Sequence, residues 1–212
     1  MIDFGDTAPT MNSEESRAHW NLKFERGEPS LTQPDPFFIA AYERFAAKAF
    51  PNAGVALDLA CGLGRHALWL ASRGWQVTAS DVSDVAIEKV RLAAIQLNVK
   101  LDLCAVDASD YEFEPMRFDL VVLFYHVDRS IFPKIISSLK QGGLLICKAR
   151  LHRNSATGAT TVSNDSPDKG ELPSLFPELQ VMYHKERPVR ERGVVEFVGR
   201  KSGNLSGLSI CR

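Results

Sequence analysis

Two aspartates flank a glycine-containing loop in the segment VALDLACGLGRHALWLASRGWQVTASDVS, residues 55–83. Gly62, Gly64 and Ala67 satisfy the G-x-G-x-x-G/A pattern, in which small residues let the backbone approach a bound cofactor. Asp81 follows at the expected end of the next strand, where a carboxylate accepts hydrogen bonds from ribose hydroxyls. By itself, this pattern suits several nucleotide cofactors.

Asp58 distinguishes between these cofactors by its charge. It precedes Gly62 by four residues, at the expected end of the first strand. A carboxylate at this point repels a pyrophosphate and attracts a cation. S-adenosylmethionine (SAM) carries a sulfonium and an ammonium group and no phosphate, so the sequence favours SAM over a nicotinamide dinucleotide. Two structural interpretations stay open: Asp58 as a cap of the loop, and Asp81 as a turn residue before a helix.

An alternation of strands and helices is expected to position these residues. Strand-like apolar segments occupy residues 55–60, 75–81, 100–107, 118–127 and 144–150. Helical patterns lie between them, and the very apolar segment FDLVVLFYHV is expected at the centre of the sheet. This order predicts an α/β fold with a mostly parallel sheet and helices on both faces. Two further strand patterns in residues 180–202 predict an antiparallel pair at the sheet edge.

Several helices have recognisable boundaries. Asp35 is the expected N-cap of one helix, because it stands directly before a proline. Ser83 is the expected N-cap of another, whose apolar stripe extends to Leu97. Residues 130–143 are predicted to form a helix that breaks or starts near Pro133.

We expect a single domain with a helical cap in residues 1–50 and a cofactor-binding core in residues 51–212. The cap contains a predicted helix over residues 14–24, in which Trp20 and Phe24 share one face. Packing in the core is the favoured role for this aromatic face, and closure over a substrate is the alternative.

The charge balance argues against a polyanionic partner. The chain has 212 residues, with 25 basic and 26 acidic side chains and a formal net charge of −1. We therefore expect no nucleic-acid partner. Because no apolar run is long enough to span a bilayer and the N-terminus lacks the apolar region of a secretory signal, we also expect no membrane partner.

The cysteines and the polar loop of the second half indicate less about function. Cys61, Cys104, Cys147 and Cys211 lack metal-type spacing, so we expect reduced thiols in a cytoplasmic protein and no metal site. The segment RNSATGATTVSNDSPDKG, residues 153–170, is long and polar, and such a loop is either functional or disordered. A flexible loop is the favoured interpretation.

The segment LDLACGLGR resembles motif I of the class I SAM-dependent methyltransferases, in the form D-x-A-C-G-x-G-R. The similarity covers most of residues 20–150 and includes VDASDYEF, FDLVVLFY and LKQGGLLI in the expected order. Within this superfamily, W-x3-F-x2-GEPS and CGLGRHALWLASRGW are similar to the tellurite-resistance methyltransferase-like group. The resemblance implies a Rossmann-like fold with a seven-stranded, mostly parallel sheet and one antiparallel strand.

The resemblance also implies roles for the glycine loop. Asp58 and the backbone of Ala60, Gly62 and Gly64 would border the methionine part and the sulfonium of SAM. Arg65, where the loop meets the helix, would contact the carboxylate of the cofactor, or it is a solvated side chain at the helix start. Ala60 occupies a position where many relatives have glycine, and alanine is small enough to be accommodated.

The adenosine part is assigned by the same resemblance to the next two strand ends. Asp81 would bind the ribose hydroxyls, and Val82 would pack on the adenine. Asp107 would accept a hydrogen bond from the adenine amino group, and the N–H of Ala108 would donate to a ring nitrogen. Asp110 is a nearby competitor for the role of Asp107, which is otherwise a turn residue.

The end of the fourth expected strand carries the candidates for chemistry. Phe124 and Tyr125 would flank the methyl group by resemblance, and His126 follows where methyl acceptors bind in this superfamily. A histidine with a pKa near neutrality accepts a proton from an acceptor, although His126 as a structural loop residue is an equally open interpretation.

The sequence therefore predicts a SAM-dependent methyltransferase that acts in line on a small-molecule acceptor. The alternatives are an NAD(P)-dependent oxidoreductase and a SAM-binding protein without turnover. Neither the acceptor nor the oligomeric state follows from the sequence.

Overall fold

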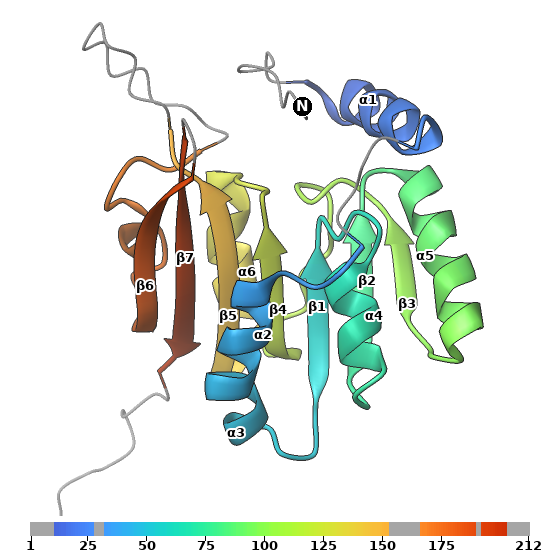
Figure 1. Cartoon of the computed structure of the whole chain (residues 1–212). Coiled ribbons are helices and arrows are strands. Elements are labelled where there is room, and N and C mark those ends of the chain that lie inside the picture. Colours follow the sequence, from blue (N-terminus) through green and yellow to red (C-terminus); the bar gives the residue numbers. More distant parts are fainter. Residues whose placement is uncertain (1–10, 28–31, 153–165, 190–191, 203–212) are drawn as a thin grey trace, which may run out of the picture.

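The structure is a computed structural model that describes residues 11–27, 32–152, 166–189 and 192–202. In these ranges seven strands form one sheet in the order β3-β2-β1-β4-β5-β7-β6 (Figure 1). The strands are β1 Val55–Leu59, β2 Gln76–Asp81, β3 Asp102–Ala105, β4 Phe118–Phe124, β5 Leu139–Arg150, β6 Leu179–Val189 and β7 Arg192–Lys201. Residues 153–165 of the expected flexible loop and Cys211 lie outside the described residues.

The strand directions confirm the expected mostly parallel sheet. Strands β3, β2, β1, β4 and β5 are parallel to one another. Strand β7 lies between β5 and β6 and is antiparallel to both of them. The apolar strand β4 occupies the central position, as predicted. Because the strand order reverses between β1 and β4, the carboxyl ends of these strands border the place where α/β sheets bind ligands.

Helices cover both faces of the sheet. The helical elements are α1 Ser13–Glu25, α2 Pro36–Ala41, the π-helix η1 Tyr42–Ala46, α3 Ala47–Ala49, α4 Arg65–Ala71, α5 Asp84–Leu97, the 3-10 helix η2 Arg129–Ile131, α6 Phe132–Ser138 and the 3-10 helix η3 Leu172–Leu175. Helices α2 and α4 lie on one face and α6 on the other, whereas α1 lies across the carboxyl ends of the strands (Figure 1). Among the described residues, no helix has the length and apolar character needed to cross a membrane.

Local side-chain caps explain where the main helices begin. The carboxylate of Asp35 accepts the Phe37 N–H at 2.9 Å, and the hydroxyl of Ser83 accepts the Ala86 N–H at 3.0 Å. Both N-caps confirm the predictions. Helix α1 begins with a capping box in which Asn12 and Glu15 satisfy each other's backbone N–H groups.

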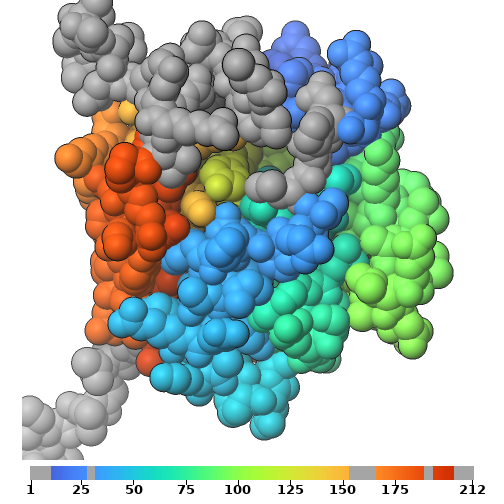
Figure 2. Space-filling model, in the orientation of Figure 1, coloured from blue at the N-terminus to red at the C-terminus, as the bar shows by residue number. Residues whose placement is uncertain are grey.

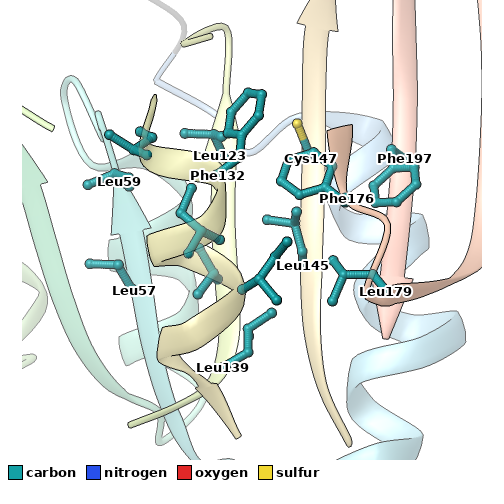
Figure 3. Packing of buried hydrophobic residues seen from close by; sticks show 14 of the residues in the cluster. Leu57, Leu59, Leu123, Phe132, Leu139, Leu145, Cys147, Phe176, Leu179 and Phe197 are labelled. Atoms are coloured by element: carbon teal, nitrogen blue, oxygen red, sulfur yellow. The ribbon is translucent and has the colours of Figure 1, made fainter. Parts of the chain in front are cut away.

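Successive side chains of each strand point to opposite faces of the sheet, so the apolar residues form two clusters, one on each face. Leu57 and Leu59 of β1 belong to the cluster beneath α6, whereas Ala56 belongs to the cluster beneath α2 and α4. Figure 3 shows Leu123 and Leu145 on the same side of the sheet as Leu57 and Leu59. Both faces of the central strands are therefore buried, as in other sheets covered by helices on both sides.

The end of α6 differs from the prediction. The helix ends at Ser138, and residues 139–143 belong to β5 instead of extending the helix. The ammonium of Lys201 on β7 donates hydrogen bonds to the carbonyls of Ile136 and Leu139, each at 2.7 Å. Lys201 thus satisfies carbonyl groups that a longer helix would bond internally. Leu97 also differs from the prediction. It was expected to belong to the apolar stripe of α5, but its side chain at the end of that helix is exposed.

The burial pattern predicts which apolar residues stabilise the fold. We expect Leu145→Ala to lower the free energy of unfolding by about 2–5 kcal/mol, because the side chain is 0% exposed and its removal leaves a cavity. Leu92→Ala on α5 is the matched control, since that leucine is 53% exposed, and should change stability by less than about 0.5 kcal/mol. Urea denaturation measures both, and equal losses would contradict the placement of Leu145 in the core.

Candidate functional site

A cavity of about 150 Å³ lies beneath α1, at the carboxyl ends of β1, β2 and β4. Its walls come from α1 and from the loops that follow the strands. The lining residues are Ser16, Trp20, Phe24, Ala60, Gly62, Asp81, Val82, Val106, Asp107, Ala108, Phe124, Tyr125 and His126. The cavity therefore collects most of the residues that the sequence singled out, at the point where the strand order reverses.

The loop after β1 turns sharply through backbone conformations that favour small residues. Ala60, Gly62 and Gly64 have φ angles of 54°, 56° and 69°. A Cβ atom on Gly64 would lie 2.8 Å from Val90, so this glycine lets the loop pack against α5. Gly62 lines the cavity and Gly64 does not, so the two glycines have different roles.

The carboxylate of Asp81 joins this loop to the turn after β2. One oxygen accepts the N–H of Gly62 at 2.8 Å, and the other accepts the N–H of Ser83 at 2.9 Å. Burial raises the pKa of Asp81, and these two N–H groups oppose the rise. An ionised carboxylate has about four acceptor positions, so two acceptor positions remain beside these two hydrogen bonds.

Asp58 is buried beneath the loop and does not line the cavity. Its carboxylate accepts the N–H of Ala67 in the first turn of α4 at 2.9 Å. Burial raises the pKa of Asp58 to about 7, against the lowering effects of that hydrogen bond and of the nearby Arg65. Arg65 is also absent from the lining, and its guanidinium lies 5.9 Å from the ring centre of Phe124.

The turn after β3 presents Asp107 and Ala108 to the cavity. One oxygen of Asp107 accepts hydrogen bonds from the N–H and the hydroxyl of Ser109, at 3.0 and 2.9 Å. Asp110 is exposed, and its carboxylate accepts the hydroxyl of Ser13 on α1. Of the two aspartates that competed for the adenine role, Asp107 is thus the one that faces the cavity.

The chain leaves β4 through a strained residue. Tyr125 has a φ angle of 61°, in the left-handed region, which costs a non-glycine residue about 1–3 kcal/mol. Its N–H donates to the carbonyl of Lys148 at 2.7 Å, which holds the turn in place. Tyr125 and His126 both line the cavity as a result, and the nearby His126 opposes the rise in the pKa of Asp81.

A second histidine near the loop has a structural role. His66 is buried, and its Nε2 accepts the N–H of Asp35 at 3.3 Å. Its ring lies between those of Phe38 and Phe124, with centroid distances of 4.5 and 4.3 Å. Burial lowers the pKa of His66 to about 2, so the ring is neutral at physiological pH.

Helix α1 supplies cavity residues that the sequence alone assigned to core packing. The rings of Trp20 and Phe24 are stacked 5.9 Å apart, and both line the cavity. The amide of Asn21 tethers α1 to the start of α5, because it donates to Asp84 at 2.7 Å and accepts the hydroxyl of Ser83 at 2.6 Å. The sequence predicted that Trp20 and Phe24 share one face of a helix. It did not predict that this face borders the cavity.

Groups that would hold a metal ion are absent from the part of the chain that the structure describes: no cluster of three histidine, cysteine or acidic side chains has the required arrangement. The cavity is also poor in cations. Of the described residues, no lysine or arginine lines it, whereas Asp81 and Asp107 do. The arrangement is therefore suited to a ligand with hydroxyl, amino or cationic groups and unsuited to a phosphate.

A family model described as a methyltransferase domain matches residues 56–143, which run from β1 into β5. S-adenosyl-L-methionine-dependent Diels-Alderase iccD of Talaromyces variabilis is 34% identical over 64 residues, which are 30% of this chain and 22% of that protein. Thiopurine S-methyltransferase of Gluconobacter oxydans is 28% identical over 79 residues, 37% of this chain and 36% of that protein. The matches thus span about a third or less of these relatives.

Solved structures share the fold over a larger part of the chain. The 1,6-didemethyltoxoflavin-N1-methyltransferase of Burkholderia thailandensis, solved with 1,6-didemethyltoxoflavin and S-adenosylhomocysteine, superposes with a TM-score of 0.67 at 17% identity over 96% of this chain and 98% of its own. TehB of Haemophilus influenzae has a TM-score of 0.65 at 17% identity, over 86% and 67% of the two chains.

The family match, the seven-stranded sheet and the loop geometry after β1 agree with the resemblance seen in the sequence. Residues 56–143 thus match a methyltransferase domain, and the fold is similar to that of solved proteins such as the 1,6-didemethyltoxoflavin-N1-methyltransferase.

Proposed function

We propose that the protein binds SAM in the cavity beneath α1 and transfers its methyl group to a small-molecule acceptor. The observation that carries this proposal is the charge of the lining: Asp81 and Asp107 contribute carboxylates, and no lysine or arginine of the described residues lines the cavity. A dinucleotide would place a pyrophosphate in this environment, whereas SAM brings hydroxyls, an amino group and a cation. The charge therefore disfavours an NAD(P)-dependent oxidoreductase.

The residues of the lining fit the parts of SAM in order. Asp81 has acceptor positions for the two ribose hydroxyls, and Val82 and Ala108 offer apolar surface and an N–H for the adenine. Asp107 has an oxygen that Ser109 does not occupy, which would accept the adenine amino group. Ala60 and Gly62 would border the methionine part.

Asp58, Gly64 and Arg65 would act from behind this surface. Asp58 braces the first turn of α4 and supplies negative charge beneath the loop. Gly64 sets the close approach of the loop to α5. We keep Arg65 as a candidate for the cofactor carboxylate, which requires its side chain to turn from Phe124 toward the cavity.

The chain's own part in the reaction is positioning and exclusion of water. When bound, SAM supplies a methyl group activated by its sulfonium. Phe124 and Tyr125 would flank the reaction centre and hold an acceptor atom about 3 Å from the methyl carbon, opposite the sulfur, for in-line transfer. Trp20 and Phe24 form an apolar roof over this space.

The size of the cavity supports a mobile cap. A volume of about 150 Å³ is smaller than the roughly 300 Å³ or more of typical ligand pockets. Within the helical cap of residues 1–50, we propose that α1 moves away from the core of residues 51–212 when SAM enters, whereas α2 stays packed in the apolar cluster of the sheet. A closed roof leaves room for a small acceptor only, and thiopurine and 1,6-didemethyltoxoflavin, in the names of two similar proteins, are small molecules.

The compartment that we propose is the cytoplasm. Cys61, Cys104 and Cys147 are free thiols, and burial raises the pKa of each, which keeps them protonated and unreactive. The absence of a nucleic-acid partner stays a prediction that rests on the charge balance.

The proposed function is tested by release of S-adenosylhomocysteine from SAM across a panel of small thiols, amines and phenols. Release with at least one acceptor supports methyl transfer. SAM binding without release from any acceptor would favour the second candidate, a SAM-dependent protein that does not transfer methyl groups, as the name of the Diels-Alderase relative illustrates. Tight binding of NADH with no response to SAM would contradict both.

Asp81 is predicted to control SAM affinity. We expect Asp81→Asn to weaken SAM binding at least tenfold, about 1.4 kcal/mol, because an amide replaces a charged acceptor of the ribose hydroxyls. Asp102→Asn, on the adjacent strand β3 and outside the cavity, is the matched control and should leave affinity unchanged. Calorimetric titration measures both, and a change of less than about threefold for Asp81→Asn would refute the ribose assignment.

The charge of Asp58 is predicted to make SAM binding depend on pH. Since its pKa is raised to about 7, Asp58 is partly protonated at neutral pH, and a nearby sulfonium would favour the ionised form. Affinity for SAM should therefore rise as the pH rises from 6 to 8. S-adenosylhomocysteine has no sulfonium, so the ratio of the two affinities isolates this effect from the titration of their common amino group.

The matched variant for this measurement is Asp58→Asn, which should make the ratio of affinities independent of pH. A flat ratio in the unaltered protein would show that Asp58 does not respond to the sulfonium and serves only as a brace for α4.

His126 is predicted to act as a base when the acceptor atom is oxygen or nitrogen. We expect His126→Ala to lower turnover by about 10²- to 10⁴-fold and to change SAM affinity by less than about threefold. His184→Ala on β6, an exposed histidine outside the cavity, is the control. Turnover that stays unchanged at every pH would leave positioning by Phe124 and Tyr125 as the whole mechanism.

A further inference from the structure

A second hollow lies on the face of the sheet that carries α2, between that helix and strands β6 and β7. Figure 2 shows this face, on which the blue residues of α2 border the orange residues of the last strands. The hollow is an open groove of about 420 Å³. Its lining residues are Asp35, Pro36, Phe37, Ala40, Ala41, Arg44, Phe45, Lys148, Tyr183, Arg187 and Glu196.

The carboxylates of this groove are already neutralised. The ammonium of Lys148 lies 3.0 Å from Asp35 and 3.6 Å from Glu196. The guanidinium of Arg187 lies 3.0 Å from the second oxygen of Glu196. Asp35 and Glu196 are almost fully buried, so these contacts form a fixed floor and leave little negative charge exposed to a ligand.

The groove has an excess of positive charge. Three cations, Arg44, Lys148 and Arg187, line it against two carboxylates, those of Asp35 and Glu196. Within the described part of the chain, no carboxylate lies within ion-pair distance of Arg44, which is exposed at the rim. An anion at Arg44 would therefore gain a charge-assisted hydrogen bond without displacing a carboxylate of the protein.

Aromatic rings supply the rest of the wall. The rings of Phe37 and Tyr183 are stacked at a centroid distance of 5.6 Å, and they connect α2 to β6. Phe45 lies further along the helical segment, and the guanidinium of Arg44 is 5.0 Å from its ring centre. Ala40 and Ala41 keep the space between these rings open. A flat ring fits such a surface because aromatic groups pack face to face or edge to face.

The groove is separate from the cofactor cavity. Among the described residues, none lines both hollows, and the wall between them contains the ring pair of Phe37 and Phe124, whose centres are 6.2 Å apart. The two hollows also differ in charge, since the cofactor cavity is lined by carboxylates and the groove by an excess of cations. A ligand of one is therefore unsuited to the other.

We propose that this groove is a second ligand site, which binds a flat aromatic carboxylate. The aromatic ring packs against Phe37, Phe45 and Tyr183, and the carboxylate pairs with Arg44 at the rim, with Arg187 nearby. The volume of the groove lies in the range typical of small-molecule sites. This proposal does not depend on methyl transfer or on SAM binding.

Indole-3-acetate is the probe for this site, and indole-3-ethanol is its neutral counterpart. We expect calorimetric titration to show saturable binding of indole-3-acetate in the micromolar to low millimolar range and binding of the alcohol at least tenfold weaker. Arg44→Gln should weaken the binding of indole-3-acetate about tenfold and leave that of the alcohol unchanged. Arg91→Gln, an exposed arginine of α5 far from the groove, is the matched control and should have no effect.

Ala40→Trp tests the position of the ring, because a large side chain there fills the groove. We expect this variant to lose indole-3-acetate binding and to retain SAM binding, which also reports that it is folded. Three outcomes would overturn the proposal: no saturable binding at 10 mM indole-3-acetate, equal affinity in Arg44→Gln, or displacement of the probe by S-adenosylhomocysteine. The SAM titrations are separate readouts, so failure of this site is distinguishable from failure of the proposed function.

Discussion

The carboxylate of Asp81 links parts of the molecule that the sheet leaves unconnected. It accepts an N–H from the loop after β1 and another from the turn after β2, so both loops are held at fixed positions on one edge of the sheet. The hydroxyl of Ser83, in the same turn, then donates to Asn21 and holds α1 over the strand ends. The floor and the roof of the cavity are thus positioned through one short segment. A change in that segment would alter both.

Much of the fold follows from local patterns. The N-caps at Asp35 and Ser83, the central position of β4 and the antiparallel pair at the sheet edge depend on residues within a few positions of each other, and the sequence predicts them. The predicted end of α6 was wrong because Lys201, which is distant in sequence, satisfies the carbonyl groups at the end of the helix. Long-range contacts of this kind leave no signal in a local pattern.

The candidate site shows the same division. Spacing along the chain identified Gly62 and Asp81, and the family resemblance assigned Asp107; all three face the cavity, because they follow strand ends. Spacing did not show that Asp58, unlike these residues, lies buried beneath the loop and outside the cavity lining, since its burial depends on where α4 packs. Nor did it place Trp20, because the contact between α1 and α5 joins residues far apart in the sequence.

The two hollows of the molecule have opposite charge although they share an aromatic wall. Fixed carboxylates line the cofactor cavity, and cations in excess line the groove beside α2. This separation lets each site reject the other's ligand by repulsion, which contributes to specificity independently of shape.

The position of β7 has a consequence for how the chain is made. Because β7 follows β6 in the sequence but lies between β6 and β5, the hydrogen-bonding edge of β5 stays open until β7 has left the ribosome. The nascent chain therefore exposes a long apolar strand edge during synthesis, and such edges pair readily with other chains. The arrival of Lys201 at the end of β7 then closes the sheet and caps α6 in the same step.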